Sequence, residues 1–278
     1  MTTRGLDLVD LARFPLDAPG SARYDAVIDD ARRQLAELGA AELSGFVTDA
    51  GVAALVADAE SLAERAFHSG GVGTPYLELP DDHWGPAHPR QRWMPYAVGA
   101  VGYDVMPKRS PLRALYESDE LLRFLCDVLD RGELHRYADP CGALNLAVMG
   151  HGDELQWHFD QTDFVVSLAI QAATQGGSFD VVPRIRSADD EHYDEVARVL
   201  AGDHEGVVTL PMTPGTLLVF EGRHSIHRVS PIGGDRLRHV GLLAYDTKAG
   251  TVSSDLLREI RYGRVEAFAE PPETWPPS

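Results

Sequence analysis

The second half of the chain alternates short apolar runs with turn residues, a pattern typical of β-structure. Seven such runs fall between residues 143 and 246, and they read ALNLAVMG, FVVSLAIQAA, SFDVVP, GVVTLPM, GTLLVF, HSIHRVSP and RHVGLLAYD. Runs of this length and spacing predict the strands of an antiparallel barrel or sandwich. A helical pattern over residues 191–200 interrupts them.

The first half has a helical pattern instead. Apolar residues recur at helical spacing from Tyr24 to Leu38, and Gly39 ends the run. Further helices are predicted over residues 52–67, 112–129 and, after the β-rich part, 254–260. Residues 70–95 are rich in Gly, Pro, His and Trp and predict a long loop, which is a candidate lid.

The change of pattern near Asp139 divides the chain into three parts of one functional unit. Residues 1–138 form a helical region with the long loop, residues 139–250 form the β core, and residues 251–278 form a helix and a tail. The expected fold class is therefore α+β, with N-terminal helices packed on a β core.

Composition places the chain among ordinary globular proteins. Hydrophobic residues make up 44% and charged residues 24% of it. The longest apolar runs, such as residues 164–170, are too short to cross a bilayer. The first residues lack an apolar stretch leading to a small-residue cleavage site. The sequence therefore predicts a cytoplasmic protein with no membrane partner.

Charge and cysteine content narrow the choice of partner. The formal net charge is −18, with 43 acidic against 25 basic residues, which disfavours binding to a nucleic-acid backbone. Cys126 and Cys141 form no C-x-x-C pair, so we expect two buried thiols and no zinc-thiolate site. The expected partner is a small-molecule substrate, and a homodimer is left open.

His158 and Asp160 are the centre of the chemical argument. In an extended strand, residues i and i+2 point to the same face, so this imidazole and this carboxylate converge while Trp157 and Phe159 point into packing. A third ligand must come from another strand, and His227 lies in such a run. Two histidines and one carboxylate leave metal positions open, which suits iron(II) binding a bidentate co-substrate and O2.

His224 competes with His227 for the third position. The two residues lie on opposite faces of a regular strand, so we assign His224 a structural or supporting role. A His-x-Asp pair alone is common by chance. The later histidine in the same β-region is what gives it weight.

Two arginines, Arg236 and Arg238, come just before the last strand and share one strand face. If 2-oxoglutarate chelates the iron through its keto-acid end, its distal carboxylate needs a cation inside the barrel, and a guanidinium is a bidentate, permanently charged partner. Arg238 lies further into the apolar run and is preferred. For either residue alone, an exposed ion pair is the alternative.

Several of these motifs occur together in one known group of enzymes. The stretch GDELQWHFD at residues 152–160, the following QGGSFDVVPRIRS and the run GTLLVFEGRHSIHRVSPIGGDRLRHVGLLAYD resemble the BesD-like iron/2-oxoglutarate enzymes, which include radical halogenases and hydroxylases of free amino acids. The likeness is strongest over residues 139–250 and extends upstream through RQRWMPYAVG and SPLRALYES. It implies a double-stranded β-helix (jelly-roll, cupin-like) core that uses Fe(II), 2-oxoglutarate and O2.

The resemblance also implies a choice between two reactions. In the halogenases of the group, a small residue replaces the carboxylate of His-x-Asp, and chloride takes the vacated iron position. Here Asp160 is present. We therefore expect hydroxylation of an unactivated C–H bond, with release of succinate and CO2, and keep halogenation as the alternative.

The substrate is less well indicated. The lysine-acting members carry a histidine three residues before the first iron ligand, where this chain has Leu155, and Gln161 stands where an acid would suit a cationic side chain. Another amino acid or small amine is therefore expected. Arg92 resembles the arginine that grips the substrate carboxylate, with a surface position as the alternative. Gln161 and Trp157 are further candidate contacts, and core packing is the alternative for Trp157.

Two rival functions fit part of the pattern. A non-catalytic, cupin-like metal sensor would use the same ligands but would not need an arginine buried beside the last strand. A zinc hydrolase would also use His158, Asp160 and His227, because geometry and availability rather than affinity select the metal. It would want a general base near the open position, and no motif nominates one.

Overall fold

The structure is a computed structural model of the chain and describes residues 4–79, 81 and 83–275. Its α-helices are α1 Ala22–Leu38, α2 Asp49–Ala63, α3 Pro111–Tyr116, α4 Asp119–Val128, α5 Tyr193–Leu200 and α6 Asp255–Tyr262. Three short 3-10 helices are η1 Gly5–Leu8, η2 Pro89–Gln91 and η3 Tyr103–Val105. The strands are β1 Ala40–Leu43, β2 Phe67–Gly73, β3 Met94–Gly102, β4 His135–Arg136, β5 Leu144–Met149, β6 Glu154–His158, β7 Val165–Gln171, β8 Gln175–Gly176, β9 Phe179–Val182, β10 Val208–Leu210, β11 Leu217–Phe220, β12 Ile226–Val229, β13 Ile232–Gly233, β14 Arg238–Leu243 and β15 Tyr245–Asp246.

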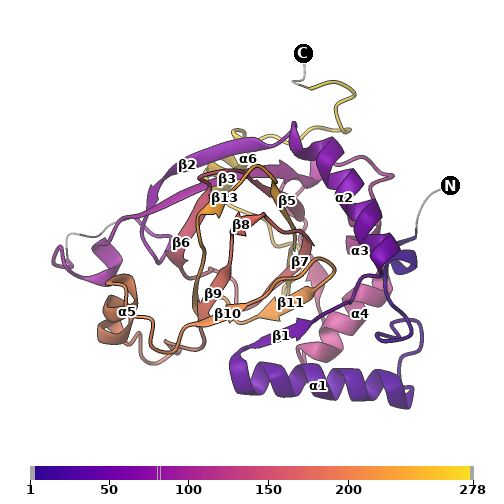
Figure 1. Cartoon of the computed structure of the whole chain (residues 1–278), viewed down its shortest axis with the longest axis horizontal. Helices are drawn as coiled ribbons and strands as arrows, with labels where there is room; N and C mark the ends of the chain where they lie inside the picture. Colours follow the sequence, from indigo (N-terminus) through magenta and orange to yellow (C-terminus); the bar gives the residue numbers. More distant parts are fainter. Residues whose placement is uncertain (1–3, 80, 82, 276–278) are drawn as a thin grey trace.

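Eleven of these strands form one curled antiparallel sheet (Figure 1). Its order is β1-β11-β7-β14-β5-β3-β6-β12-β9-β10, and β2 pairs with the free side of β3. Strands β5 and β6 follow each other along the same side of β3, separated by a turn. Each of the seven apolar runs identified in the sequence contains a strand of this sheet, so the predicted antiparallel β core is confirmed.

Alternation along the strands divides the buried side chains into an interior and an exterior cluster. Inside the curl lie Met149, Phe179, Leu218 and their neighbours. On the outside, Leu168 and the residues around it belong to a larger cluster shared with the helices. Successive side chains of a strand point to opposite faces, so both clusters follow from period-two patterning.

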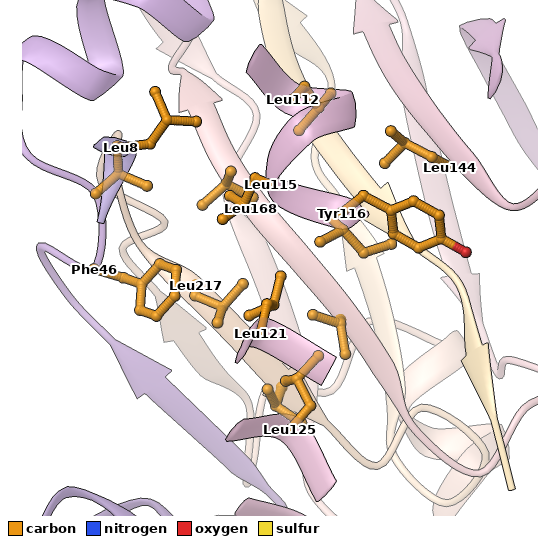
Figure 2. Close-up of a cluster of buried hydrophobic side chains, with 14 of the residues drawn as sticks. Leu8, Phe46, Leu112, Leu115, Tyr116, Leu121, Leu125, Leu144, Leu168 and Leu217 are labelled. Atoms are coloured by element: carbon orange, nitrogen blue, oxygen red, sulfur yellow. The ribbon is translucent and has the colours of Figure 1, made fainter. Parts of the chain in front are cut away.

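The helices cover the outer face of the sheet on the side of β7, β14 and β5. Figure 2 shows Leu112, Leu115 and Leu121 of α3 and α4 beside Leu168 and Leu217 of the strands. All five side chains are at most 2% exposed, and burying a leucine fully contributes about 1.5–3 kcal/mol. This packed layer fixes β14, which begins at Arg238, and its neighbours β5 and β7.

The structure corrects two expectations for the first half of the chain. Residues 112–129 do not form one helix, because Ser118 accepts a hydrogen bond from the N–H of Leu121 and starts a second helix, α4. Residues 70–95 are not one loop, because their ends belong to β2 and β3. These strands, together with β1, add three members from the N-terminal half to the main sheet.

The remaining helices occur near their predicted positions, although α2 begins three residues earlier than expected, at Asp49 after the N-cap Thr48. Cys126 and Cys141 are both free thiols, but only Cys141 is buried as expected, whereas Cys126 is partly buried. Within the part of the chain that the structure describes, every helix is too short or too polar to span a membrane.

Candidate metal centre

A directly opposed pair of histidines forms the base of the site. His158 at the end of β6 faces His227 on β12, and their ring centroids are 4.3 Å apart. Between Leu155 and His158 the register with β12 shifts by one residue, which is a β-bulge in β6. The bulge allows both Leu155 and His158 to point into the barrel, while Trp157 packs outside.

Asp160 lies two residues past His158, in the turn that follows β6. Its backbone N–H donates to the carbonyl of Gly222 at 3.1 Å, and the N–H of Phe159 donates to the carbonyl of Pro75 at 2.7 Å. These bonds hold the turn so that Oδ2 of Asp160 lies 3.2 Å from Nε2 of His227. The ligand atoms of His158, Asp160 and His227 all lie within 4.8 Å of one another.

The donor set fits a divalent metal ion. Nδ1 of His158 is 2.8 Å from the carbonyl of Gln156, and Nδ1 of His227 is 2.9 Å from that of Ser225. A carbonyl can only accept, so each Nδ1 carries the proton and each Nε2 presents a lone pair. Oδ2 of Asp160 is buried and, among the described residues, has no hydrogen-bond partner. A metal ion would satisfy all three atoms.

Electrostatics place His158 and Asp160 in the protonation states that metal binding requires, whereas burial lowers the pKa of His227 but the Asp160 carboxylate outweighs it, so that the pKa of His227 is raised in the metal-free site. Burial is the main cause that lowers the pKa of His158 to about 4, and the neighbouring His227 adds to it. Burial raises the pKa of Asp160, but the imidazoles of His227 and His158 outweigh it, and the pKa falls to about 2. At neutral pH, His158 is therefore neutral and Asp160 is ionised.

Of the two candidate arginines, only Arg238 is inside. Its side chain is buried, and no carboxylate pairs with it among the residues that the structure describes. Its Nη1 donates a weak hydrogen bond to Sδ of Met149 at 3.8 Å. Burial lowers its pKa to about 10, so it stays charged at neutral pH. Arg236 is exposed and donates to the carbonyl of Ala172 at 2.8 Å.

The Arg238 guanidinium borders a cavity of about 210 Å³. Its polar lining includes Gln171, Ser178 and Thr209, and its apolar lining includes Leu210 and Met212 of the interior cluster. Two other members of that cluster, Phe179 and Phe220, contact the ring of His227. The cavity and the histidine pair therefore belong to one barrel interior.

The long segment between β2 and β3 covers the turn that carries Asp160. Beyond the Pro75 bond, the ring of Tyr76 packs 5.2 Å from that of Phe159, and the guanidinium of Arg186 lies 3.9 Å from the same ring. Arg90 joins this segment to α5 through the hydroxyl of Tyr193 at 2.9 Å. Pro80 and Asp82, within the expected lid, lie outside the described residues.

The other predicted residues lie around this centre rather than in it. His224 is in the turn before β12 and is not part of the ligand cluster. Trp157 is buried in a separate hydrophobic cluster with Phe159 and Val182, under the guanidinium of Arg228, which favours core packing. Gln161 is exposed, and its amide reaches the carbonyl of Leu77 in the lid segment. Arg92 is exposed after η2.

Sequence reasoning missed the residues that position the ligands through backbone contacts. A Cβ atom on Gly222 would overlap Oδ2 of Asp160, so this glycine makes room for the carboxylate. Pro75 holds the turn through its carbonyl. No pattern of side chains in the sequence indicates the role of Gly222 or Pro75, because both roles depend on segments that are distant in the sequence.

Solved structures share this arrangement of strands. A 2OG-Fe(II) oxygenase family oxidoreductase from Burkholderia pseudomallei superposes with a TM-score of 0.50 at 16% identity, covering 80% of this chain and 92% of that one. AviO1 from Streptomyces viridochromogenes Tue57 gives 0.54 at 19% identity, covering 82% and 96%. The epimerase SnoN, solved with Fe3+, α-ketoglutarate and nogalamycin RO, gives 0.54 at 13% identity, covering 80% and 84%. The fold is thus the double-stranded β-helix of the 2-oxoglutarate Fe(II) oxygenases, as predicted.

The family follows from the sequence itself. Residues 94–261 match the sequence profile of Halogenase D (HalD), and this match covers more than half of the chain. The chain therefore belongs to the Halogenase D family. No curated protein sequence matches it significantly.

Proposed function

We propose that this protein is an Fe(II)- and 2-oxoglutarate-dependent oxygenase that hydroxylates an unactivated C–H bond of a free amino acid or a similar small amine. The observation that carries the proposal is the pairing of two incomplete sites in one barrel. One is a ligand cluster with an unsatisfied Asp160 oxygen, and the other is a buried Arg238 that lacks an anionic partner among the described residues.

The ligand cluster supports iron(II). Two imidazoles and one carboxylate, all contributed from one side, are the donor set of non-haem iron oxygenases and leave room for a co-substrate. The backbone carbonyls of Gln156 and Ser225 orient the two rings and increase the basicity of their Nε2 atoms. When bound, the iron and 2-oxoglutarate would activate O2 and supply the oxidising power for C–H cleavage.

Arg238 supports 2-oxoglutarate as the co-substrate. A charged guanidinium buried without a counter-ion is unfavourable until an anion pairs with it. A dicarboxylate that binds the metal at one end would bring its second carboxylate to such a partner, and a charged pair inside the barrel is strong because water is excluded. A metal-binding sensor or a zinc hydrolase gives no reason for this buried cation.

Asp160 supports hydroxylation over halogenation. Its carboxylate lies beside the two imidazoles and takes the position that chloride would need. Gly222 leaves space for that carboxylate, so the turn is shaped around it. Halogenation is the second candidate, because the matching family is described as Halogenase D.

The first experiment is an anaerobic titration with Fe(II) and 2-oxoglutarate. We expect a weak visible charge-transfer band that needs both components. An O2-dependent assay of succinate over a panel of amino acids and amines then identifies the substrate, and mass spectrometry of the product distinguishes the two reactions. Absence of both the band and succinate would refute the oxygenase proposal. A chlorinated main product would refute the hydroxylase branch alone.

A further inference from the structure

The bulge in β6 stands opposite Arg228 of β12. Its two residues, Gln156 and Trp157, face this one residue, because the pairs on either side of them are in register. Two residues that oppose one define a β-bulge. The carbonyl of Gln156 also accepts from Nδ1 of His158 at 2.8 Å. The conformation of the bulge therefore sets the orientation of a metal-ligand ring.

Arg228 connects the bulge to the neighbouring strand β9. Its guanidinium carbon lies 4.8 Å from the centroid of the Trp157 ring, which is a cation–π contact, and its Nε donates to Oδ2 of Asp180 at 2.8 Å. Arg228 and Asp180 are register partners on β12 and β9. The Arg228 side chain therefore joins three adjacent strands of the sheet, β6, β12 and β9.

Asp180 is the buried anchor of this contact. It is 5% exposed and stands between Phe179 and Val181, two members of the interior cluster, so its carboxylate points to the outer face of the barrel. Both of its oxygens are bonded, because Oδ1 accepts from the hydroxyl of Thr209 on β10 at 2.7 Å, and Oδ2 accepts from Arg228. A buried ion pair adds little net stability, so its main effect here is to hold one geometry.

Trp157, Arg228 and Asp180 form an outer network that lies directly behind the metal centre. Adjacent residues of a strand point to opposite faces, so each outer residue has an inner neighbour at the site. The three neighbouring pairs are Trp157 and His158, Arg228 and His227, and Asp180 and Phe179. The ring of Phe179 in turn lies 5.5 Å from that of His227. A displacement of the outer side chains would therefore move the backbone that carries both histidines.

We propose that the outer network positions the metal ligands: by holding the bulge in β6, it sets the orientation of His158 towards His227. The inference rests on the proposed function, because it assigns these three residues a role at the metal centre of that function. None of them belongs to the ligand cluster, so they are positioning residues rather than ligands. Removing a contact that supports a metal ligand typically weakens metal binding by about 10- to 100-fold.

Asp180→Asn removes the charge that holds Arg228 and keeps the shape of the side chain. The amide oxygen can still accept from Thr209, but the amide NH2 group cannot accept from the Arg228 guanidinium. We expect the Kd of Fe(II), measured by anaerobic calorimetric titration with the metal alone, to rise about tenfold or more. Arg228→Gln should have the same effect. Arg228→Lys, which keeps the charge, should recover part of the affinity.

Hydrogen–deuterium exchange tests the bulge in the metal-free protein. The backbone amides of β6 should exchange faster in Asp180→Asn than in the wild type, because local opening of this strand becomes less costly. Those of β5, which pairs with β3 and β14, should exchange at the wild-type rate. This measurement needs no bound metal, so it reports on the bulge independently of the proposed function.

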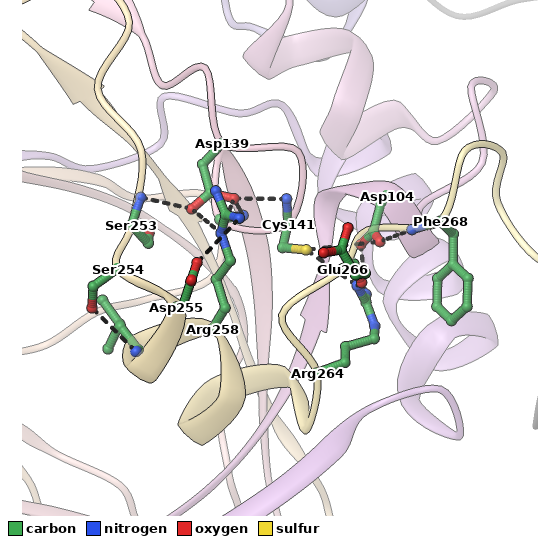
Figure 3. A network of polar contacts seen from close by, with 12 residues as sticks. Asp104, Asp139, Cys141, Ser253, Ser254, Asp255, Arg258, Arg264, Glu266 and Phe268 are labelled. Atoms are coloured by element: carbon green, nitrogen blue, oxygen red, sulfur yellow. Dashed lines mark hydrogen bonds and ion pairs between the residues drawn. The ribbon is translucent and has the colours of Figure 1, made fainter.

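A second buried carboxylate provides a matched control (Figure 3). Asp104 lies 2.7 Å from Arg264, and the Arg264 guanidinium lies 4.4 Å from the centroid of the Phe268 ring. This group also combines an aspartate, an arginine and an aromatic ring, but none of its residues adjoins a metal ligand in the sequence. Asp104→Asn should lower the free energy of unfolding without changing the Kd of Fe(II) or the exchange of β6.

Three results would overturn the positioning role. They are an unchanged Kd of Fe(II) in Asp180→Asn, an unchanged exchange of β6 in the same variant, and an equal loss of Fe(II) affinity in Asp104→Asn, which would indicate a general effect of stability. A wild type that binds no Fe(II) contradicts the proposed function instead.

Discussion

Gly222 and Asp160 are in direct contact across two turns: the carbonyl of Gly222 accepts the N–H of Asp160 at 3.1 Å, and its missing side chain leaves the space that the carboxylate occupies. Gly222→Ala should displace the carboxylate and weaken Fe(II) binding by about 10- to 100-fold, the usual effect of disturbing a supporting contact. Titration with Fe(II) under anaerobic conditions measures it. Gly132→Ala, where a Cβ meets open space, is the control. Equal metal affinity in both variants would contradict this role.

The ligand assignment predicts different effects for replacing His227, a ligand, and His224, which lies three residues before it. His158→Ala, Asp160→Ala and His227→Ala should each abolish succinate formation, because each removes one of three metal ligands, while circular dichroism shows a retained fold. His224→Ala should keep measurable turnover, since His224 lies in the turn outside the cluster. An inactive His224→Ala beside an active His227→Ala would reverse the assignment.

Arg238→Gln should raise the Kd of 2-oxoglutarate by about 30-fold or more, because losing one partner of a buried charge pair costs about 2–5 kcal/mol. The free energy of unfolding of the ligand-free protein should not fall, since Arg238 has no acidic partner to lose among the described residues. Arg236→Gln, at an exposed position, should change neither quantity much. A larger effect of Arg236→Gln on the Kd would move the carboxylate site to that residue.

The hydroxylase branch predicts a product heavier by one oxygen, even in abundant chloride. Asp160→Gly removes the carboxylate and should lose most hydroxylation. We expect at most a trace of chlorination from it, because the contacts that orient a halide matter about 10- to 100-fold and are not provided by a single substitution. The chlorine isotope pattern in the mass spectrum reports the outcome for both proteins.

A buried histidine outside the site predicts the dependence of stability on pH. His239 is fully buried, both of its ring nitrogens lack partners among the described residues, and burial lowers its pKa to about 4. An unfolded histidine has a pKa of about 6.5, so the unfolded state binds the proton first. The free energy of unfolding should therefore fall as pH drops from 6.5 towards 4.

Urea denaturation at several pH values measures this effect. Between pH 7 and pH 4.5 the contribution of His239 is on the order of 2 kcal/mol. His239→Leu should lose less stability over this interval than the wild type does. If the free energies of unfolding of the two proteins fell equally with pH, His239 would not titrate in this way.

The sequence predicted those features that depend on local pattern. The strands after residue 143 follow from their alternation, and His158, Asp160 and His227 follow from residue type and spacing. Strands β2 and β3 were missed because β2 is an exposed, glycine-rich edge strand, whose residues Gly70, Gly71 and Gly73 carry no alternating pattern. The break at Ser118 was missed because both flanking segments are equally helical in character.

Other features depend on contacts between distant segments and leave no local pattern. The space at Gly222 and the carbonyl of Pro75 arise only when separate parts of the chain meet. The preference for Arg238 over Arg236 agrees with their burial in the structure, because the apolar neighbours of Arg238 continue into β14.

The bulge in β6 has a consequence for how this site tolerates insertions and deletions. One extra residue stands between Leu155 and His158. Odd-numbered residues before the bulge and even-numbered residues after it therefore lie on the same face of the strand. Deleting one residue at Gln156 or Trp157 would place Leu155 and His158 two positions apart, and a regular strand points both side chains to one face at that spacing. Inserting one residue there while the bulge is kept would instead place Leu155 and His158 on opposite faces. A one-residue insertion is therefore equivalent to losing a metal ligand, whereas a one-residue deletion removes the bulge and keeps His158 facing inward.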